Sequence, residues 1–228
     1  MFLFLPSYRM TLDTPASRPR LALFDLDHTL LPIDSDYEWG EFTTRIGWTD
    51  PQEFGRRNAE FFAYYQAGTL DIHEYVRFAT QAICQHGPEA AALAHARFMQ
   101  EVIAAAIRPA ALALLRQHQA AGDHVLIITA TNEFVTRPIA QALGVQTLLA
   151  MALERDAQGR YTGAITGVPT MREGKVLRMQ QWLAQRQLAG QLSREIAAVR
   201  LALVSLLAEL EATIDFPDDV EAPPREQI

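Results

Sequence analysis

The chain has 228 residues, 49% of them hydrophobic and 21% charged, which is the composition of an ordinary globular protein and excludes a disordered one. Its 27 acidic and 20 basic residues give a net charge of −7 without any cluster of lysine or arginine, so we expect neither nucleic acid nor a membrane as a partner. A single cysteine, Cys84, cannot form an internal disulfide, which favours a cytoplasmic location. The apolar run at residues 2–5 is too short for a signal peptide, and residues 1–19 are expected to be a flexible extension.

The first predicted element is a strand that ends in acidic residues. Residues 21–25 are an apolar run up to Asp25, as in a strand that is buried on both faces of a parallel sheet. Asp25 and Asp27 are two positions apart, so in an extended chain their side chains point the same way and converge on one site. Because carboxylates are costly to bury unless they are paired or used, this site is expected to hold a cation, to perform acid–base chemistry, or both.

A long helical region follows the first strand, from about residue 34 to 108. Asp50-Pro51 places a good N-cap before a proline in the first turn of a helix, and Asp71 opens a second helix. Gly87-Pro88 is expected to break this second helix and to begin an alanine-rich one. Pro109 begins a further helix.

The second half of the chain alternates strands and helices, which predicts a doubly wound, parallel α/β sheet of the Rossmann-like kind, with the helical region inserted after its first strand. A continuous apolar run predicts the second strand, and a turn that contains Asp and Gly predicts a β-hairpin. The predicted elements are a strand at 125–129, a helix at 133–143, a strand at 145–153, a hairpin through 156–165 and a helix at 174–186.

Four polar side chains are expected at the carboxyl ends of these strands, where doubly wound sheets bind their ligands. Asp25 and Asp27 follow the first strand, Thr129 ends the second, and Lys175 opens the last predicted helix. A helix N-terminus and a lysine favour a phosphate, and two carboxylates favour Mg²⁺. Together these groups supply the nucleophile, the acid–base partner and the charge neutralisation that phosphoryl transfer requires.

Three short segments resemble the first three motifs of the haloacid dehalogenase superfamily. They are Phe24-Asp-Leu-Asp-His-Thr-Leu30, Ile127-Ile-Thr-Ala-Thr-Asn132 and Arg172-Glu-Gly-Lys175. The likeness covers about residues 20–187 and is strongest to the phosphoserine-phosphatase-like hydrolases of subfamily IB. It implies a core made of residues 20–33 and 109–187, with a helical cap at 34–108 that selects the substrate.

The resemblance also implies a role for each of the four residues. Asp25 would be the nucleophile that forms an aspartyl-phosphate, and Asp27 would protonate the leaving group and then activate water. Asp25 and the backbone carbonyl of Asp27 would bind Mg²⁺, while Thr129 and Lys175 would bind the phosphoryl oxygens. Simpler interpretations stay open at this point: Thr129 as a helix N-cap, and Lys175 as a solvated residue at a helix start.

The fourth motif of the superfamily, an acidic loop that supplies a further carboxylate to Mg²⁺, is missing from the expected region after residue 187. The segment from about residue 187 to 220 instead resembles a fragment of the helical domain of the tRNA-modifying GTPase MnmE. Residues 188–228 are therefore expected to have a different origin from the rest of the chain. Asp215, Asp218 and Asp219 are the nearest substitutes for the missing carboxylate. Apolar residues at alternating spacings of four and three predict a C-terminal helix in place of the usual last strands; they are Leu192, Ile196, Val199, Leu203, Leu206 and Leu210.

These observations lead to two competing hypotheses. The first is a Mg²⁺-dependent phosphomonoester hydrolase that acts on a small phosphorylated metabolite and is weakened by the loss of the fourth motif. The second is a catalytically inactive shell or fusion fragment that acts, if at all, through its C-terminal helix. Without a further strand beside it, the first strand would be an exposed apolar edge, so we also expect self-association through this edge or through the C-terminal helix.

Overall fold

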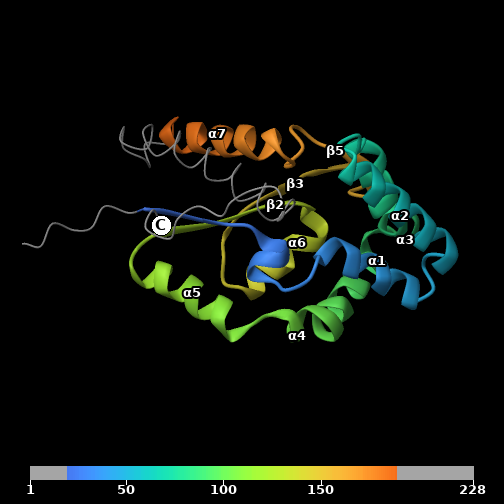
Figure 1. The fold of residues 1–228 in the computed structure, drawn as a ribbon, viewed down its shortest axis with the longest axis horizontal. Helices are drawn as coiled ribbons and strands as arrows, with labels where there is room; N and C mark the ends of the chain where they lie inside the picture. The colour runs from blue at the N-terminus through green and yellow to red at the C-terminus, as the bar shows by residue number, and fades with distance from the viewer. Residues whose placement is uncertain (1–19, 189–228) are drawn as a thin grey trace, which may run out of the picture.

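The computed structural model describes residues 20–188 (Figure 1). The predictions made for residues 1–19, for the C-terminal helix and for the substitute ligands Asp215, Asp218 and Asp219 lie outside the described residues. Within the described part, the chain forms a parallel sheet covered by helices, which confirms the predicted α/β fold class. No single helix in this part is long and apolar enough to cross a membrane, and one helix pair passes that test by length and composition only if a 90° bend is allowed.

Three parallel strands form the main sheet. In spatial order they are β1 (Leu21–Phe24), β2 (His124–Asn132) and β3 (Thr147–Met151). β2 lies in the centre, and its residues from Val125 to Thr129 are all buried. Leu23 of β1 pairs with Leu126 of β2, and within residues 20–188 β1 pairs with no other strand. Among the described strands, β1 therefore lies at an edge of the sheet.

Helices cover both faces of this sheet: α5 (Pro109–Ala120) and α6 (Glu133–Ala142) lie on one face, and α7 (Glu173–Leu188) lies on the other (Figure 1). The alternation of side chains along β2 produces these layers, because neighbouring residues of a strand point to opposite faces. Leu126 and Ile128 pack against α7. Val125 and Ile127 belong to the larger core that α5 and α6 share with the rest of the molecule.

Three helices form most of the insertion between β1 and α5. They are α1 (Ser35–Arg45), α2 (Pro51–Gln66) and α3 (Ile72–Phe98), and the turn Met99–Ile103 (η2) and α4 (Ala104–Ala106) follow them. Each of the three begins after an aspartate, Asp34, Asp50 or Asp71, whose carboxylate accepts hydrogen bonds of 2.9–3.1 Å from two backbone amides of the first turn. The helices predicted after Asp50 and Asp71 are confirmed.

Gly87 interrupts α3, although helical residues continue on both sides of it. Its backbone has φ of 77° and ψ of 172°, a conformation that glycine adopts without a steric penalty. Pro88 follows where a new first turn begins, so its missing N–H leaves no hydrogen bond unmade. The predicted break is confirmed as a kink at a single residue.

A small antiparallel hairpin lies beside α3. It consists of β4 (Leu153–Arg155) and β5 (Tyr161–Ile165), and it confirms the predicted hairpin. Gly163 in β5 has a positive φ of 83°, a backbone conformation that favours glycine. The strand predicted at 145–153 is wrong at its end, since the chain leaves the parallel sheet after Met151 and Leu153 already belongs to the hairpin.

Aromatic side chains join the insertion to the helices on the sheet. Trp39 of α1 is 2% exposed, and the centre of its ring lies 5.3 Å from the ring centres of Phe98 in α3 and Phe134 in α6. His95 of α3 belongs to the same cluster and forms a hydrogen bond of 3.0 Å with the backbone oxygen of Val135. This cluster fixes the position of α1 relative to α6.

Replacing Trp39 by alanine is expected to lower the free energy of unfolding by about 3–5 kcal/mol, because it removes a buried aromatic side chain and leaves a cavity. Leu93→Ala is the matched control, since Leu93 is 72% exposed on α3; it should change the free energy by less than about 0.5 kcal/mol. Urea denaturation followed by circular dichroism measures both values. Similar values for the two variants would contradict the central position of Trp39.

Candidate active site

The chain leaves β1 in an extended conformation that carries two carboxylates to the end of the sheet. Asp25 caps the turn Leu26–Leu30 (η1), and its Oδ1 accepts a hydrogen bond from the amide of Leu26 at 2.9 Å. Leu26 is fully buried, so the alternation of side chains directs Asp25 and Asp27 away from the core. His28 has a positive φ of 56°, where the chain turns back.

Lys175 approaches Asp25 from the other end of the described chain. It lies in the first turns of α7, its side chain is 5% exposed, and its Nζ is 3.5 Å from Oδ1 of Asp25. A buried ammonium group requires a nearby anion to offset its loss of hydration. The interpretation of Lys175 as a solvated helix-start residue is therefore wrong.

Asp27 receives hydrogen bonds on both of its carboxylate oxygens. The backbone amide of Ser35, at the start of α1, donates to Oδ1 at 2.8 Å. The hydroxyl of Thr131 donates to Oδ2 at 2.9 Å, and the hydroxyl of Thr129 is 3.4 Å from the same oxygen. Sequence analysis does not single out Thr131. Its spacing of two from Thr129, which is also the spacing of the two aspartates, is the signal that could have found it.

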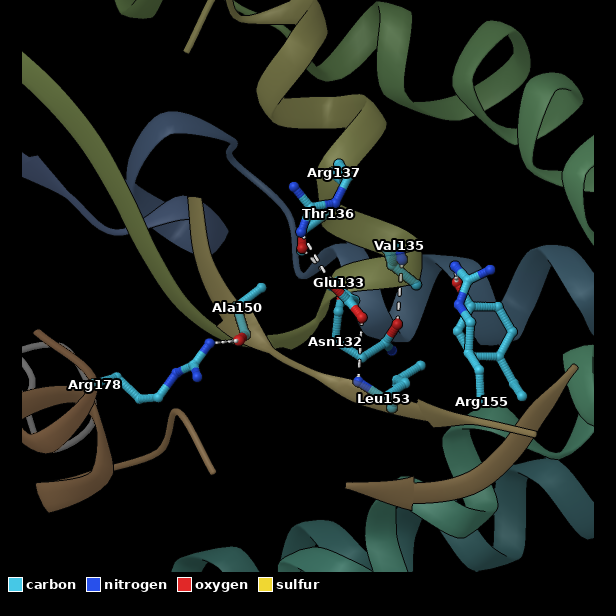
Figure 2. Close-up of polar contacts among 10 residues, drawn as sticks. Asn132, Glu133, Val135, Thr136, Arg137, Ala150, Leu153, Arg155 and Arg178 are labelled. Carbon is cyan, nitrogen blue, oxygen red and sulfur yellow. Dashed lines mark hydrogen bonds and ion pairs between the residues drawn. The ribbon is translucent and has the colours of Figure 1, made fainter. Parts of the chain in front are cut away.

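The start of α6 is fixed by its own cap and by a link to the hairpin (Figure 2). Oδ1 of Asn132 accepts a hydrogen bond from the amide of Val135 at 3.2 Å, and Oε1 of Glu133 accepts one from the amide of Leu153 at 3.3 Å. Asn132 is therefore the N-cap of α6. Thr129 lies within β2, so its interpretation as a helix N-cap is wrong.

Burial raises the pKa of Asp27 from its usual 3.8 to about 6, and the nearby negative charge of Asp34 adds to this increase. The hydrogen bonds from Ser35 and Thr131 stabilise the ionised form and offset part of the increase in the pKa. A carboxyl group with this pKa can both lose and gain a proton near neutral pH, as a general acid and base must.

The four predicted residues, Asp25, Asp27, Thr129 and Lys175, line one cavity of about 900 Å³. The ends of β1 and β2 and the start of α7 form one side of this cavity. The helices of the insertion form the other side and contribute aromatic rings to it, which are those of Tyr37, Phe61, Phe62, Tyr65 and Tyr75. The structure thus brings together side chains that are distant in the sequence around a space large enough for a small organic phosphate.

Asp36 is a buried carboxyl group that sequence analysis does not single out. Its Oδ2 accepts a hydrogen bond from the hydroxyl of Tyr75 at 2.6 Å, and its Oδ1 accepts one from the amide of the Asn132 side chain at 3.1 Å. It therefore links α1 to α3 and to the start of α6. Burial, followed by the charge of Asp34, raises the pKa of Asp36 to about 7. The sequence offered one signal for Asp36, which is its place two positions after a helix N-cap. Acids are common in the first turns of helices, so this signal does not distinguish Asp36 from other acids.

The first turn of α7 and the turn that precedes it require glycine at position 174, because a Cβ there would overlap the backbone carbonyl oxygen of Pro169. Arg172, in the same turn, has a positive φ of 48°. Its guanidinium group lies 5.7 Å from the centre of the Tyr65 ring, and its Nη2 is 3.5 Å from the carbonyl oxygen of Tyr65 at the end of α2. The turn thus positions Lys175 and at the same time contacts the helical insertion.

The described residues contain no group of three or more His, Cys, Asp and Glu side chains that could hold a metal ion. Asp25 and the backbone carbonyl of Asp27 would offer a cation two oxygens, and the hydrogen bond and ion pair of Asp25 both use Oδ1. Mg²⁺ keeps several waters and binds through one or two carboxylates together with a substrate phosphate. This set of donors therefore fits Mg²⁺ bound with phosphate, but it is no complete cage.

Residues 22–199 match the family model of haloacid dehalogenase-like hydrolases. The match includes all three strands of the sheet except Leu21, together with the insertion and the cavity residues. It also continues past residue 187, into the segment for which a different origin is predicted from the sequence. The comparisons give no support to the likeness of residues 187–220 to MnmE.

Individual relatives agree with this family match. A histidinol-phosphatase from Neisseria meningitidis is 39% identical over 166 residues, which is 73% of this chain and 75% of the relative. A crystal structure of a protein with unknown function from Bordetella pertussis is 48% identical, with a TM-score of 0.69 over 73% of this chain and 75% of the other. A phosphoserine phosphohydrolase-like protein from Francisella tularensis shares the fold alone, with 12% identity and a TM-score of 0.52 over 72% of this chain and 73% of the other.

Asp36 is expected to make the free energy of unfolding fall as the pH rises from about 4 to about 7, because it holds its proton more tightly in the folded than in the unfolded chain. A carboxyl group with a raised pKa contributes stability that is complete below its unfolded value of 3.8 and is lost as the pH passes its folded value of about 7. Asp27 titrates in the same range, so Asp36→Asn should reduce the pH dependence by about half.

Urea titrations between pH 4 and pH 8, in the presence of a chelator, measure this dependence. Asp71→Asn is the matched control, since hydrogen bonds to backbone amides lower the pKa of Asp71 and place its effect on stability below this pH range. An equal pH dependence in Asp36→Asn and in the wild type would contradict the assignment of the titration to Asp36.

Proposed function

The chain belongs to the haloacid dehalogenase-like hydrolase family, and on that premise we propose that it is a Mg²⁺-dependent phosphomonoesterase that acts on a small phosphorylated metabolite. The prediction of an enzyme of this family is confirmed. The observation that carries the rest of the proposal is the convergence of Asp25, Asp27, Thr129 and Lys175 on one cavity.

In the proposed complex, the phosphoryl group lies between Asp25 and the two groups that favour its negative charge. The ammonium of Lys175 and the hydroxyl of Thr129 would hold phosphoryl oxygens, and Lys175 would also offset the charge of Asp25. Asp25 and the backbone carbonyl of Asp27 would hold Mg²⁺, which supplies further neutralisation of the phosphoryl oxygens when bound.

The proposed reaction has two steps. In the first, a carboxylate oxygen of Asp25 attacks phosphorus, the ester P–O bond breaks, and Asp27 gives its proton to the leaving alkoxide. In the second, water attacks the phosphorus of the aspartyl-phosphate while Asp27 takes a proton from that water. The P–O bond to Asp25 then breaks, which releases phosphate and restores both aspartates. The raised pKa of Asp27, about 6, supports its part in both steps.

We propose that the helices of residues 34–108 form a cap that selects the substrate. This cap covers a core made of residues 20–33 and 109–187. Their aromatic side chains, among them Tyr37, Phe61 and Tyr75, face the same cavity as the aspartates. A relative that is 39% identical is named histidinol-phosphatase, so histidinol phosphate is the first substrate to test. We further propose a cytoplasmic location, in keeping with the single cysteine. We also propose self-association through β1, which is an edge strand within residues 20–188.

The alternative function is an inactive shell. It is favoured by one observation: the described residues hold no cluster of three potential metal-binding side chains, so a weak Mg²⁺ site would leave Asp25 poorly neutralised. The two functions differ in a simple assay, because only the enzyme turns over a phosphomonoester in a way that requires both Mg²⁺ and Asp25.

Asp25→Asn should lower the hydrolysis of 4-nitrophenyl phosphate and of histidinol phosphate by roughly 10³-fold or more, because the covalent route is lost. Removal of Mg²⁺ by EDTA should stop turnover by the wild type, and added Mg²⁺ should restore it. Asp156→Asn, on the hairpin, is the matched control and should retain activity. No turnover of either substrate by the wild type at millimolar Mg²⁺ would instead support the inactive shell.

Gly174→Ala should lower kcat/KM by about 10²-fold, since the clash with the carbonyl of Pro169 displaces the turn that positions Lys175. Gly55→Ala provides the matched control, because a Cβ at this exposed position of α2 meets no other atom within 4 Å. It should keep full activity and stabilise the helix by about 0.5–1 kcal/mol. Steady-state kinetics and thermal unfolding of both variants measure these effects; full activity in Gly174→Ala would show that the turn does not limit the site.

A further inference from the structure

We propose that Thr131 is a positioning residue for Asp27, and that the two threonines at the end of β2 have different roles. In this proposal, Thr131 orients the carboxyl group of Asp27, which acts as the general acid and base. The hydroxyl of Thr129 then binds a phosphoryl oxygen. The inference rests on the proposed function and adds a residue to it.

The two threonines lie two positions apart in β2, so both side chains emerge on the same side of the strand. Both are buried, with 1% of Thr129 and 8% of Thr131 exposed. Their contacts with Oδ2 of Asp27 are unequal. The hydroxyl of Thr131 is at 2.9 Å, which is an ordinary hydrogen-bond length, whereas that of Thr129 is at 3.4 Å, beyond the usual range for two oxygens.

The backbone reinforces this division. The amide of Thr131 donates a hydrogen bond to Oγ1 of Thr129 at 3.1 Å, so the oxygen of Thr129 already serves as an acceptor. Because Thr131 supplies the close donor to Oδ2 of Asp27, the hydroxyl proton of Thr129 is available to a stronger acceptor in the cavity. A phosphoryl oxygen is such an acceptor.

Thr131 also completes the orientation of the Asp27 carboxyl group. The amide of Ser35 holds Oδ1 at 2.8 Å, and Thr131 holds Oδ2 at 2.9 Å, so the plane of the group is defined from two elements, α1 and β2. The hydroxyl of Thr131 can turn to donate to either lone pair of Oδ2, so the other lone pair can carry the proton that Asp27 gives to the leaving group. Thr131 can therefore hold Asp27 both before and after proton transfer to the leaving group.

The test compares Thr131→Val, which keeps the shape of the side chain and removes its hydroxyl, with Thr131→Ser, which keeps the hydroxyl. Each is measured with 4-nitrophenyl phosphate, whose leaving group needs little protonation, and with an alkyl phosphate that the wild type hydrolyses. We expect Thr131→Val to lower kcat/KM, which reports the steps up to formation of the aspartyl-phosphate, by about 10- to 100-fold for the alkyl substrate and by less than about threefold for the aryl substrate. Thr131→Ser should restore most of the loss.

Thr80→Val is the control for the loss of a buried threonine hydroxyl, because the hydroxyl of Thr80 donates to the carbonyl of Val76 within α3 and Thr80 does not line the cavity. Should Thr131→Val not fold, Thr131→Ala takes its place with the same expected pattern. Equal losses of kcat/KM with both substrates, or equal losses in the valine and serine variants, would overturn the proposal. A wild type without turnover is a different result, since it would reject the proposed function itself.

Discussion

The desolvation of two carboxylates at the end of β1 is the constraint on which the rest of the structure depends. A charged group that leaves water without compensation costs several kcal/mol, so each aspartate requires its own partners. Asp25 has the ammonium of Lys175, and Asp27 has the amide of Ser35 and the hydroxyl of Thr131. These partners come from α7, α1 and β2, so the two acids tie together the three elements that surround the cavity. The raised pKa of Asp27 shows that its compensation is incomplete.

Much of this arrangement could be predicted from the sequence because its causes are local. An apolar run that stops at two acids defines a buried strand and a site, and an aspartate before a helical stretch defines the start of that helix. Parallel strands end at one edge of their sheet, which is enough to place Asp25 near Thr129. The position of Lys175 in the site could not be predicted from local physics, because a lysine in the first turns of a helix carries no signal of burial. The prediction came from the resemblance of its motif to that of the superfamily.

The remaining features depend on contacts between distant segments, and no local pattern contains them. In the sequence, Asp36 is an ordinary acid in the first turn of a helix. Its special environment comes from hydrogen bonds with Tyr75 and Asn132, which are distant in the sequence. Thr131 acquires a partner only when β2 lies beside the end of β1. The border between β3 and β4 is set by the packing of the hairpin against α3, because the apolar pattern itself runs on through Leu153.

Arg172 and Tyr65 connect the turn before α7 to the end of α2 through a cation–π contact and a hydrogen bond. A guanidinium group over an aromatic ring at an exposed position contributes about 0.5–1 kcal/mol, which corresponds to a pair that is apart in roughly one molecule in three to one molecule in six. Arg172 and Tyr65 both line the cavity that holds the two aspartates, so a rotation of the Arg172 side chain changes the wall of the site without a change in the sheet.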